Sequence, residues 1–114
     1  MAVALGAFGA HGLKARFASL ADAAQRLAWW ETAAHYHLTH ALAIGLSAYL
    51  VSRAPASAAA TVAGWCFAGG IVLFSGSLYA MTLTGVRALG AVTPFGGLLL
   101  LAGWVGVVIA ALRS

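Results

Sequence analysis

Two long stretches of the chain are apolar and carry no charged side chain, residues 54–86 and residues 88–112. A helix needs about 20 consecutive apolar residues to cross the hydrocarbon core of a bilayer. The sequence therefore predicts membrane-spanning helices over about residues 58–83 and 90–112.

The start of the last helix has two interpretations. Thr93 and Pro94 have the residue types of an N-cap and a first helical position, and a helix from Pro94 to Leu112 is about 28 Å long. Alternatively, the helix begins near Leu89 and kinks at Pro94.

The first half of the chain contains two further apolar stretches. Residues 1–13 are uncharged, but as a helix they measure only about 20 Å. We expect them to be the C-terminal part of a first membrane helix whose beginning is missing or misassigned. Residues 31–51 form the predicted second span, and Glu31 is the only Asp, Glu, Lys or Arg among them. Pro55 prevents the helix from continuing.

Between these stretches, residues 14–30 are more polar. Ser19 and Asp22 fit the S-x-x-D capping pattern, which predicts that a helix begins near Leu20. Asp22 and Arg26 are spaced to pair on the surface of that helix. Its apolar and polar residues fall on opposite faces, so we expect an amphipathic segment at the membrane surface.

Trp29 and Trp30 end this segment, and we expect them at the level of the lipid headgroups. The sequence has no Gly or Pro between Leu13 and Ile44. The amphipathic segment and the second span therefore form either one long helix or two helices with a bend near residues 29–32.

The predicted fold is all-α, a single membrane domain of four transmembrane helices in an antiparallel bundle. The spans are about 1–13 (truncated), 31–51, 58–83 and 90–112. Small residues recur at every fourth position, a spacing that lets helices approach closely. These stripes are Ala2, Gly6 and Ala10; Ala60, Gly64 and Ala68; and Ala102, Gly106 and Ala110.

The composition supports this class. Hydrophobic residues make up 63% and charged residues 7% of the chain, with a mean hydropathy of +0.97. Soluble domains are about 45–50% apolar and about 25% charged. The net charge of +4 comes from basic residues scattered at the ends of apolar stretches. We therefore expect the lipid bilayer of the bacterial inner membrane as the partner, and no nucleic acid.

One carboxylate and three imidazoles share the second span: Glu31, His35, His37 and His40. Helical spacing separates them into two pairs, because His37 and His40 project from a different side than Glu31 and His35. His37 and His40 could ligate a metal, although His11 is the only further imidazole. Haem would need His11 facing His37 or His40 from another helix. Structural hydrogen bonding to neighbouring helices is the alternative for the whole cluster, and no cofactor is assigned.

Hydroxyl groups lie within the third span and at the start of the fourth: Ser75, Ser77, Tyr79 and Thr93. Such groups usually bond a carbonyl of their own helix or a neighbouring helix. A site for a lipid headgroup or a quinone is the more specific hypothesis. Counted from the ends of their spans, His40 and Ser75 lie at a similar depth, so we expect His40 to hydrogen-bond the Ser75–Tyr79 patch.

The sequence contains no P-loop, no Ser-His-Asp set and no nucleophile with a plausible base beside it. We therefore expect a non-enzymatic accessory, assembly or packing component of a membrane complex or homo-oligomer. The alternative is a membrane protein that binds haem, a metal or a quinone through its histidine cluster.

Four sequence runs together resemble the small YgdD-like integral membrane proteins, which are related to transmembrane protein 256 of animals. The resemblance implies four membrane helices and an unknown function, and it singles out His11, His40, Ser75, Ser77, Tyr79, Thr93 and Pro94. Relatives carry a longer apolar run ahead of the first of these runs. The runs are residues 6–12, residues 30–33 with 37–43, residues 73–79, and residues 93–97 with Gly103 and Trp104.

Overall fold

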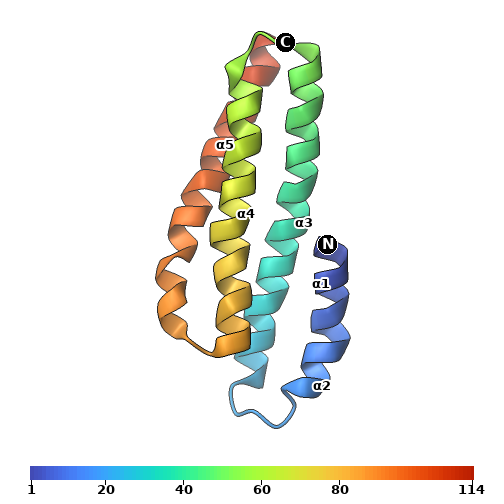
Figure 1. The fold of residues 1–114 in the computed structure, drawn as a ribbon, viewed down its shortest axis with the longest axis vertical. Helices are drawn as coiled ribbons and strands as arrows, with labels where there is room; N and C mark the ends of the chain where they lie inside the picture. The colour runs from blue at the N-terminus through green and yellow to red at the C-terminus, as the bar shows by residue number, and fades with distance from the viewer.

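The computed structural model describes all 114 residues as four helical rods without any β-strand (Figure 1). The first rod is short and combines α1, a π-helical turn and α2. The elements are α1 (Ala2–Phe8), the π turn (Gly9–Leu13), α2 (Lys14–Arg16), α3 (Ala23–Arg53), α4 (Ala58–Thr84), a 3-10 turn (Arg87–Ala91) and α5 (Thr93–Arg113).

Helix α4 lies in the middle of the molecule and packs along both α3 and α5, while α3 and α5 touch only sparsely. The result is a long, thin molecule of 54 × 26 × 14 Å. The first rod packs against α3. It runs beside only the N-terminal half of α3, so that Met1 lies level with the middle of that helix (Figure 1).

Two helical stretches are long and apolar enough to cross a membrane, Ala58–Thr84 and Arg87–Arg113. They coincide with the two uncharged stretches of the sequence. The first rod is too short to meet this criterion. Helix α3 is 31 residues long, but its charged residues and three imidazoles lower its hydropathy.

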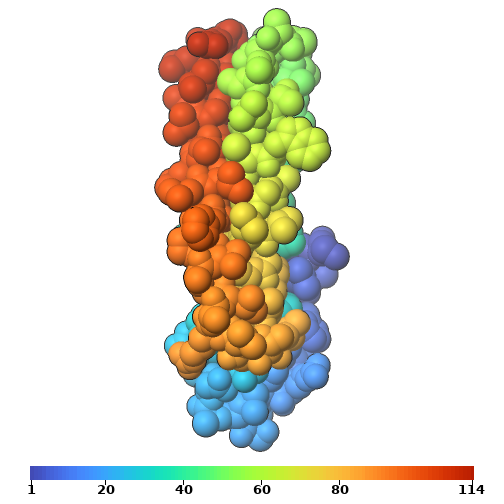
Figure 2. Space-filling model, turned by 60° about the vertical axis from the view of Figure 1, so that its left-hand side comes forward, coloured from blue at the N-terminus to red at the C-terminus, as the bar shows by residue number.

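The outer surface is apolar along α4 and α5, which lie side by side over most of the length of the molecule (Figure 2). Only 25 of the 114 residues are buried, and large side chains such as Trp65, Phe95 and Leu101 are exposed. Soluble monomers rarely expose apolar patches above a few hundred Å². This surface is therefore suited to lipid rather than water.

Glycines bring α4 and α5 into close contact. A Cβ atom on Gly96 would collide with the backbone at Leu73 and Phe74, and one on Gly103 would collide with the Phe67 ring. The helices therefore approach each other as closely as their backbones allow. The stripe predicted on α5 is confirmed only in part, because Gly106 contacts α4 whereas Ala102 is exposed.

The start of α3 differs from the prediction. The helix begins at Ala23 rather than near Leu20, and Asp22 is its N-cap residue. The Asp22 carboxylate does not cap the backbone but accepts a hydrogen bond from Arg26 Nε at 3.0 Å, as the spacing predicted. Of the two alternatives for the next segment, one long helix is confirmed, since α3 continues through Trp30 without a break.

The Asp22–Arg26 pair predicts a pH-dependent stability. The hydrogen bond from Arg26 holds the pKa of Asp22 below its usual value. A carboxyl group with a lowered pKa stabilises the folded state above its unfolded pKa, and this contribution disappears as the pH falls through the folded value. We therefore expect Asp22→Asn to be less stable than the wild type near pH 7, with the difference shrinking once the pH falls below the unfolded pKa of about 4 and disappearing below the lowered folded pKa. Unfolding in detergent at several pH values measures this; a constant difference would contradict it.

Arg26 also joins the end of α4. Its Nη1 donates to the carbonyl of Thr82 at 3.2 Å, and the Thr82 hydroxyl donates to the carbonyl of Arg26 at 3.1 Å. A cation beside the last carbonyls of a helix is favourable. The helix then ends at Gly85, whose φ of 72° lies in the left-handed region.

Gly85→Ala is expected to lower the free energy of unfolding by about 1–2 kcal/mol, because alanine is strained at this φ. Its Cβ would also meet the Arg26 guanidinium. Gly85→Asn is the control, since asparagine adopts the left-handed region more readily. Equilibrium unfolding of the two variants should rank alanine below asparagine; the reverse order would refute the assignment of backbone strain.

The start of α5 is one residue earlier than predicted. Val92 is the N-cap residue, Thr93 is the first residue of the helix, and Pro94 lies in the first turn. The alternative of a kinked helix from Leu89 is not found, because that residue belongs to the separate 3-10 turn. Thr93 makes no capping bond, and its hydroxyl is used elsewhere.

Candidate functional site

His40 lies on α3 and is buried where this helix faces α5, with 5% of its surface exposed. Trp104 Nε1 donates to His40 Nε2 at 3.1 Å, so this ring nitrogen is an acceptor. The proton must then be on Nδ1, which lies 2.7 Å from the carbonyl oxygen of Tyr36 and donates to it. This geometry describes a neutral imidazole that bridges two helices.

The prediction that His40 hydrogen-bonds the Ser75–Tyr79 patch is wrong. Ser75 instead donates to the carbonyl of Ala33 at 2.8 Å. Because α3 begins at Ala23 and does not restart after Trp30, His40 lies about two helical turns farther along α3 than the level of Ser75. Its ring therefore meets Phe67 of α4 and Trp104 of α5.

The other predicted polar residues make separate contacts between helices. His37 Nδ1 lies 3.2 Å from the Tyr79 hydroxyl, which joins α3 to α4. The Ser77 and Thr93 hydroxyls are 2.6 Å apart and join α4 to α5, while Ser77 also donates to its own helix at Phe74. The candidate residues are thus distributed over several helix contacts rather than gathered around one point.

His11 lies apart from the other candidates, exposed on the π turn of the first rod. None of the rings that surround His40 comes from that rod. No group of three or more His, Cys, Asp or Glu side chains is arranged to hold a metal ion. Both nitrogens of His40 are engaged, so neither presents a free lone pair to a metal or a haem iron.

An aromatic cluster around His40 was not predicted from the sequence. The rings of His40, Phe67 and Trp104 lie 5.2–5.9 Å apart, centre to centre. The Tyr36 ring is nearly parallel to that of His40, at 8°, and contacts Phe74. Trp104 appears in the sequence runs that carry the family resemblance, but nothing in its position along the chain connects it to a histidine.

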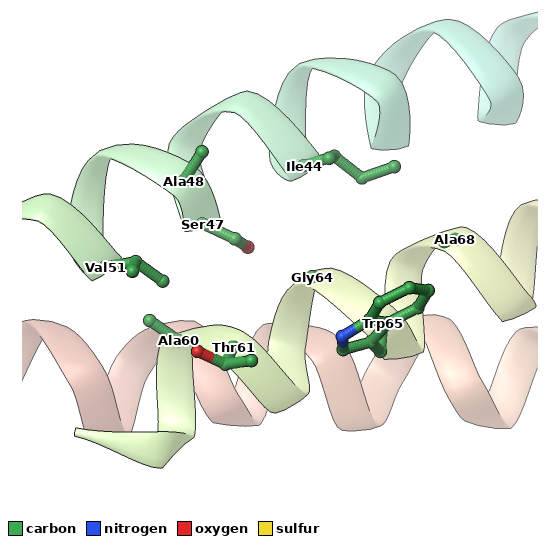
Figure 3. Close-up of a pocket in the computed structure, with 9 residues that line it drawn as sticks. All are labelled: Ile44, Ser47, Ala48, Val51, Ala60, Thr61, Gly64, Trp65 and Ala68. Atoms are coloured by element: carbon green, nitrogen blue, oxygen red, sulfur yellow. The ribbon is translucent and has the colours of Figure 1, made fainter. Parts of the chain in front are cut away.

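The surface has two hollows, which differ in chemistry. The seam groove, about 440 Å³, lies between α3 and α4 and is almost entirely apolar (Figure 3). The aromatic groove, about 530 Å³, lies between α3 and α5 beside His40. The seam groove is lined by Ile44, Ser47, Ala48, Val51, Ala60, Thr61, Gly64, Trp65 and Ala68.

Comparison with known proteins places the chain in a family. Residues 5–97 match the family described as "Protein of unknown function (DUF423)". The chain belongs to this family. It is 42% identical to the UPF0382 membrane protein YwdK of Bacillus subtilis over 113 residues, which is 99% of this chain and 88% of the relative. It is 46% identical to the UPF0382 membrane protein SERP0230 of Staphylococcus epidermidis over 99% of the chain and 87% of the relative.

A third DUF423 relative, UPF0382 membrane protein SH2409 of Staphylococcus haemolyticus, is 43% identical over 99% of this chain and 87% of its own length. No solved structure matches the chain. The names of the relatives and the two apolar helices agree that this DUF423 chain is a membrane protein.

Proposed function

We propose that this DUF423 chain is a four-span protein of the bacterial inner membrane, related to the YgdD-like proteins. In this proposal it acts without catalysis, as an assembly or packing component of a homo-oligomer or a larger membrane complex. The first rod, α3, α4 and α5 are the four spans. The imidazoles of His37 and His40 do not oppose this assignment for α3, because both rings bond neighbouring helices inside the bundle.

The seam groove is the observation that carries this proposal. On α3, Ala48 projects from the same side as Trp30 and Ala34. Trp30 donates to the carbonyl of Leu5, and Ala34 faces Gly6, so this is the side that the first rod covers. The groove therefore continues the line of the first rod along α3 and α4, beyond the level of Met1.

The walls of the seam groove suit a helix. Four of its lining residues have small or no side chains: Ala48, Ala60, Gly64 and Ala68. Small residues allow the backbone of an added helix to come close. The N-terminal half of the same side already holds a helix, the first rod. In this proposal, a transmembrane helix from a partner chain or a second copy continues that arrangement along the groove.

Photo-cross-linking in native membranes tests the proposal. A photoreactive amino acid at Thr61, on the groove wall, is expected to give a discrete cross-linked product. The same amino acid at Val108, an exposed position on α5, is the matched control and should give none. A product of twice the chain mass identifies a homo-oligomer, and another fixed mass identifies a complex.

Filling the groove provides the second half of the test. Ala48→Phe should abolish the cross-link from Thr61, whereas Val108→Phe should leave it unchanged. An apolar helical extension fused ahead of Met1, in register with α1, would enter the same groove and should also abolish it. Equal cross-linking from Thr61 and Val108, or no effect of Ala48→Phe, would contradict the proposal.

A further inference from the structure

The aromatic groove has the composition of a small-molecule site. Its volume of about 530 Å³ falls within the range of ligand pockets, which are mostly apolar with a few polar groups. Four of its ten lining residues carry flat rings. The lining comprises Tyr36, Thr39 and His40 of α3, Phe74 of α4, and Pro94, Gly97, Leu98, Leu100, Leu101 and Trp104 of α5.

The rings that line the groove are held in place by contacts within the protein. His40 is fixed by two hydrogen bonds, one of them to Trp104. Tyr36 is nearly parallel to His40, with ring centres 5.9 Å apart, and lies 4.5 Å from Phe74. A flat, unsaturated ring gains most from such walls, because aromatic rings prefer offset or edge contacts with one another.

One hydrogen-bond donor in the groove is free. Trp104 Nε1 donates to His40 Nε2, and His40 Nδ1 donates to the carbonyl of Tyr36. Thr39 donates to the carbonyl of His35. The Tyr36 hydroxyl has no partner in the chain, and the residue is 40% exposed. A ligand that fits this site should therefore carry an acceptor, such as a carbonyl oxygen, on its ring.

The rim of the groove is apolar. Leu98 and Leu101 line it and are each 64% exposed, on a helix apolar enough to cross a membrane. An apolar tail on a ligand would contact these two leucines.

We propose that the aromatic groove binds the ring of an isoprenoid quinone. The flat ring of a quinone would pack against the aromatic side chains of the groove. Its carbonyl oxygens would accept a hydrogen bond from the Tyr36 hydroxyl, and its apolar tail would lie against Leu98 and Leu101. The site lies between α3 and α5, away from the seam groove, so it does not depend on the proposed assembly role.

Titration of the purified protein in phosphatidylcholine nanodiscs with a benzoquinone that carries one isoprene unit tests this inference. Tryptophan fluorescence reports binding, because Trp104 lines the groove. Saturable quenching is expected in the wild type. Tyr36→Phe should weaken binding about fivefold, the value of one neutral hydrogen bond. Gly97→Leu, which fills the groove, should weaken it at least tenfold.

Ala48→Phe, which fills the other groove, is the matched control and should bind as the wild type does. Ring-free farnesol should not compete with the quinone. Quenching that rises without saturation and equally in all variants would overturn the inference, as would equal competition by farnesol. If Gly97→Leu does not fold, unchanged affinity in Tyr36→Phe still overturns it. Absence of the Thr61 cross-link in the wild-type chain, together with intact quinone binding, would refute the assembly role alone.

Discussion

Gly96→Ala is expected to lower the free energy of unfolding by about 3 kcal/mol, at the upper end of what one added methyl group costs in a packed interior. Its Cβ would meet the backbone of Leu73 and Phe74, which cannot move aside as a side chain can. Helices α4 and α5 would have to separate near the start of α5. Equilibrium unfolding in mixed micelles measures the difference.

Gly76→Ala is the matched control, since a Cβ atom there would have no neighbour within 4 Å. It should leave stability unchanged or raise it by up to about 1 kcal/mol, because alanine favours helix more than glycine does. Equal effects of the two substitutions would show that α4 and α5 are not in backbone contact at Gly96.

Trp30→Ala is expected to cost about 3–4 kcal/mol and to release the first rod from α3. The side chain is 4% exposed and packs against Leu13, Phe17 and Tyr79. Its Nε1 also donates to the carbonyl of Leu5 at 2.6 Å. Limited proteolysis at the turn after α2, together with unfolding, reports the release.

Phe95→Ala removes a large ring from a position that is 65% exposed and lies in neither groove, and it should change stability by less than about 0.5 kcal/mol. Trp30→Phe keeps an aromatic ring and removes the hydrogen bond, so about 1 kcal/mol is expected. If Trp30→Ala and Phe95→Ala behave alike, the first rod does not depend on this contact.

The positions of α4 and α5 could be predicted from the sequence because each occupies a long apolar stretch without a charged residue, the pattern typical of a membrane helix. Their ends were predictable to within a few residues for the same reason: Pro55, Gly85 and Arg87 interrupt the apolar pattern. The single long helix α3 was one of two alternatives. The sequence could not decide between them. Whether this segment bends depends on its tertiary contacts, and no residue in it marks a bend.

The partner of His40 could not be predicted, because the pairing of two helices depends on where each one starts. The depth of His40 was counted from a span that begins after Trp30, whereas α3 continues unbroken from Ala23 and already bonds the end of α4 at Arg26. This earlier pairing places His40 about two turns past Ser75 and beside Trp104. The energetic expectation that the imidazole points inward was nevertheless confirmed, since His40 is buried.

Trp30 shows a second limit of the sequence. Tryptophan beside an apolar stretch suggested a place among the lipid headgroups, but the residue is buried against the first rod. Gly9 makes room for its ring, because a Cβ atom at this position would collide with the indole. Only the pairing of the two helices reveals this contact, and neither residue indicates it alone.

Native mass spectrometry of the protein extracted from its own membrane in mild detergent tests the assembly role most directly. We predict one defined species heavier than the chain, either a fixed multiple of its mass of 11.5 kDa or a fixed combination with a second protein. Ala48→Phe should convert that species to the single chain, and Val108→Phe should not. A wild-type spectrum that contains only the single chain with bound lipid would contradict the account.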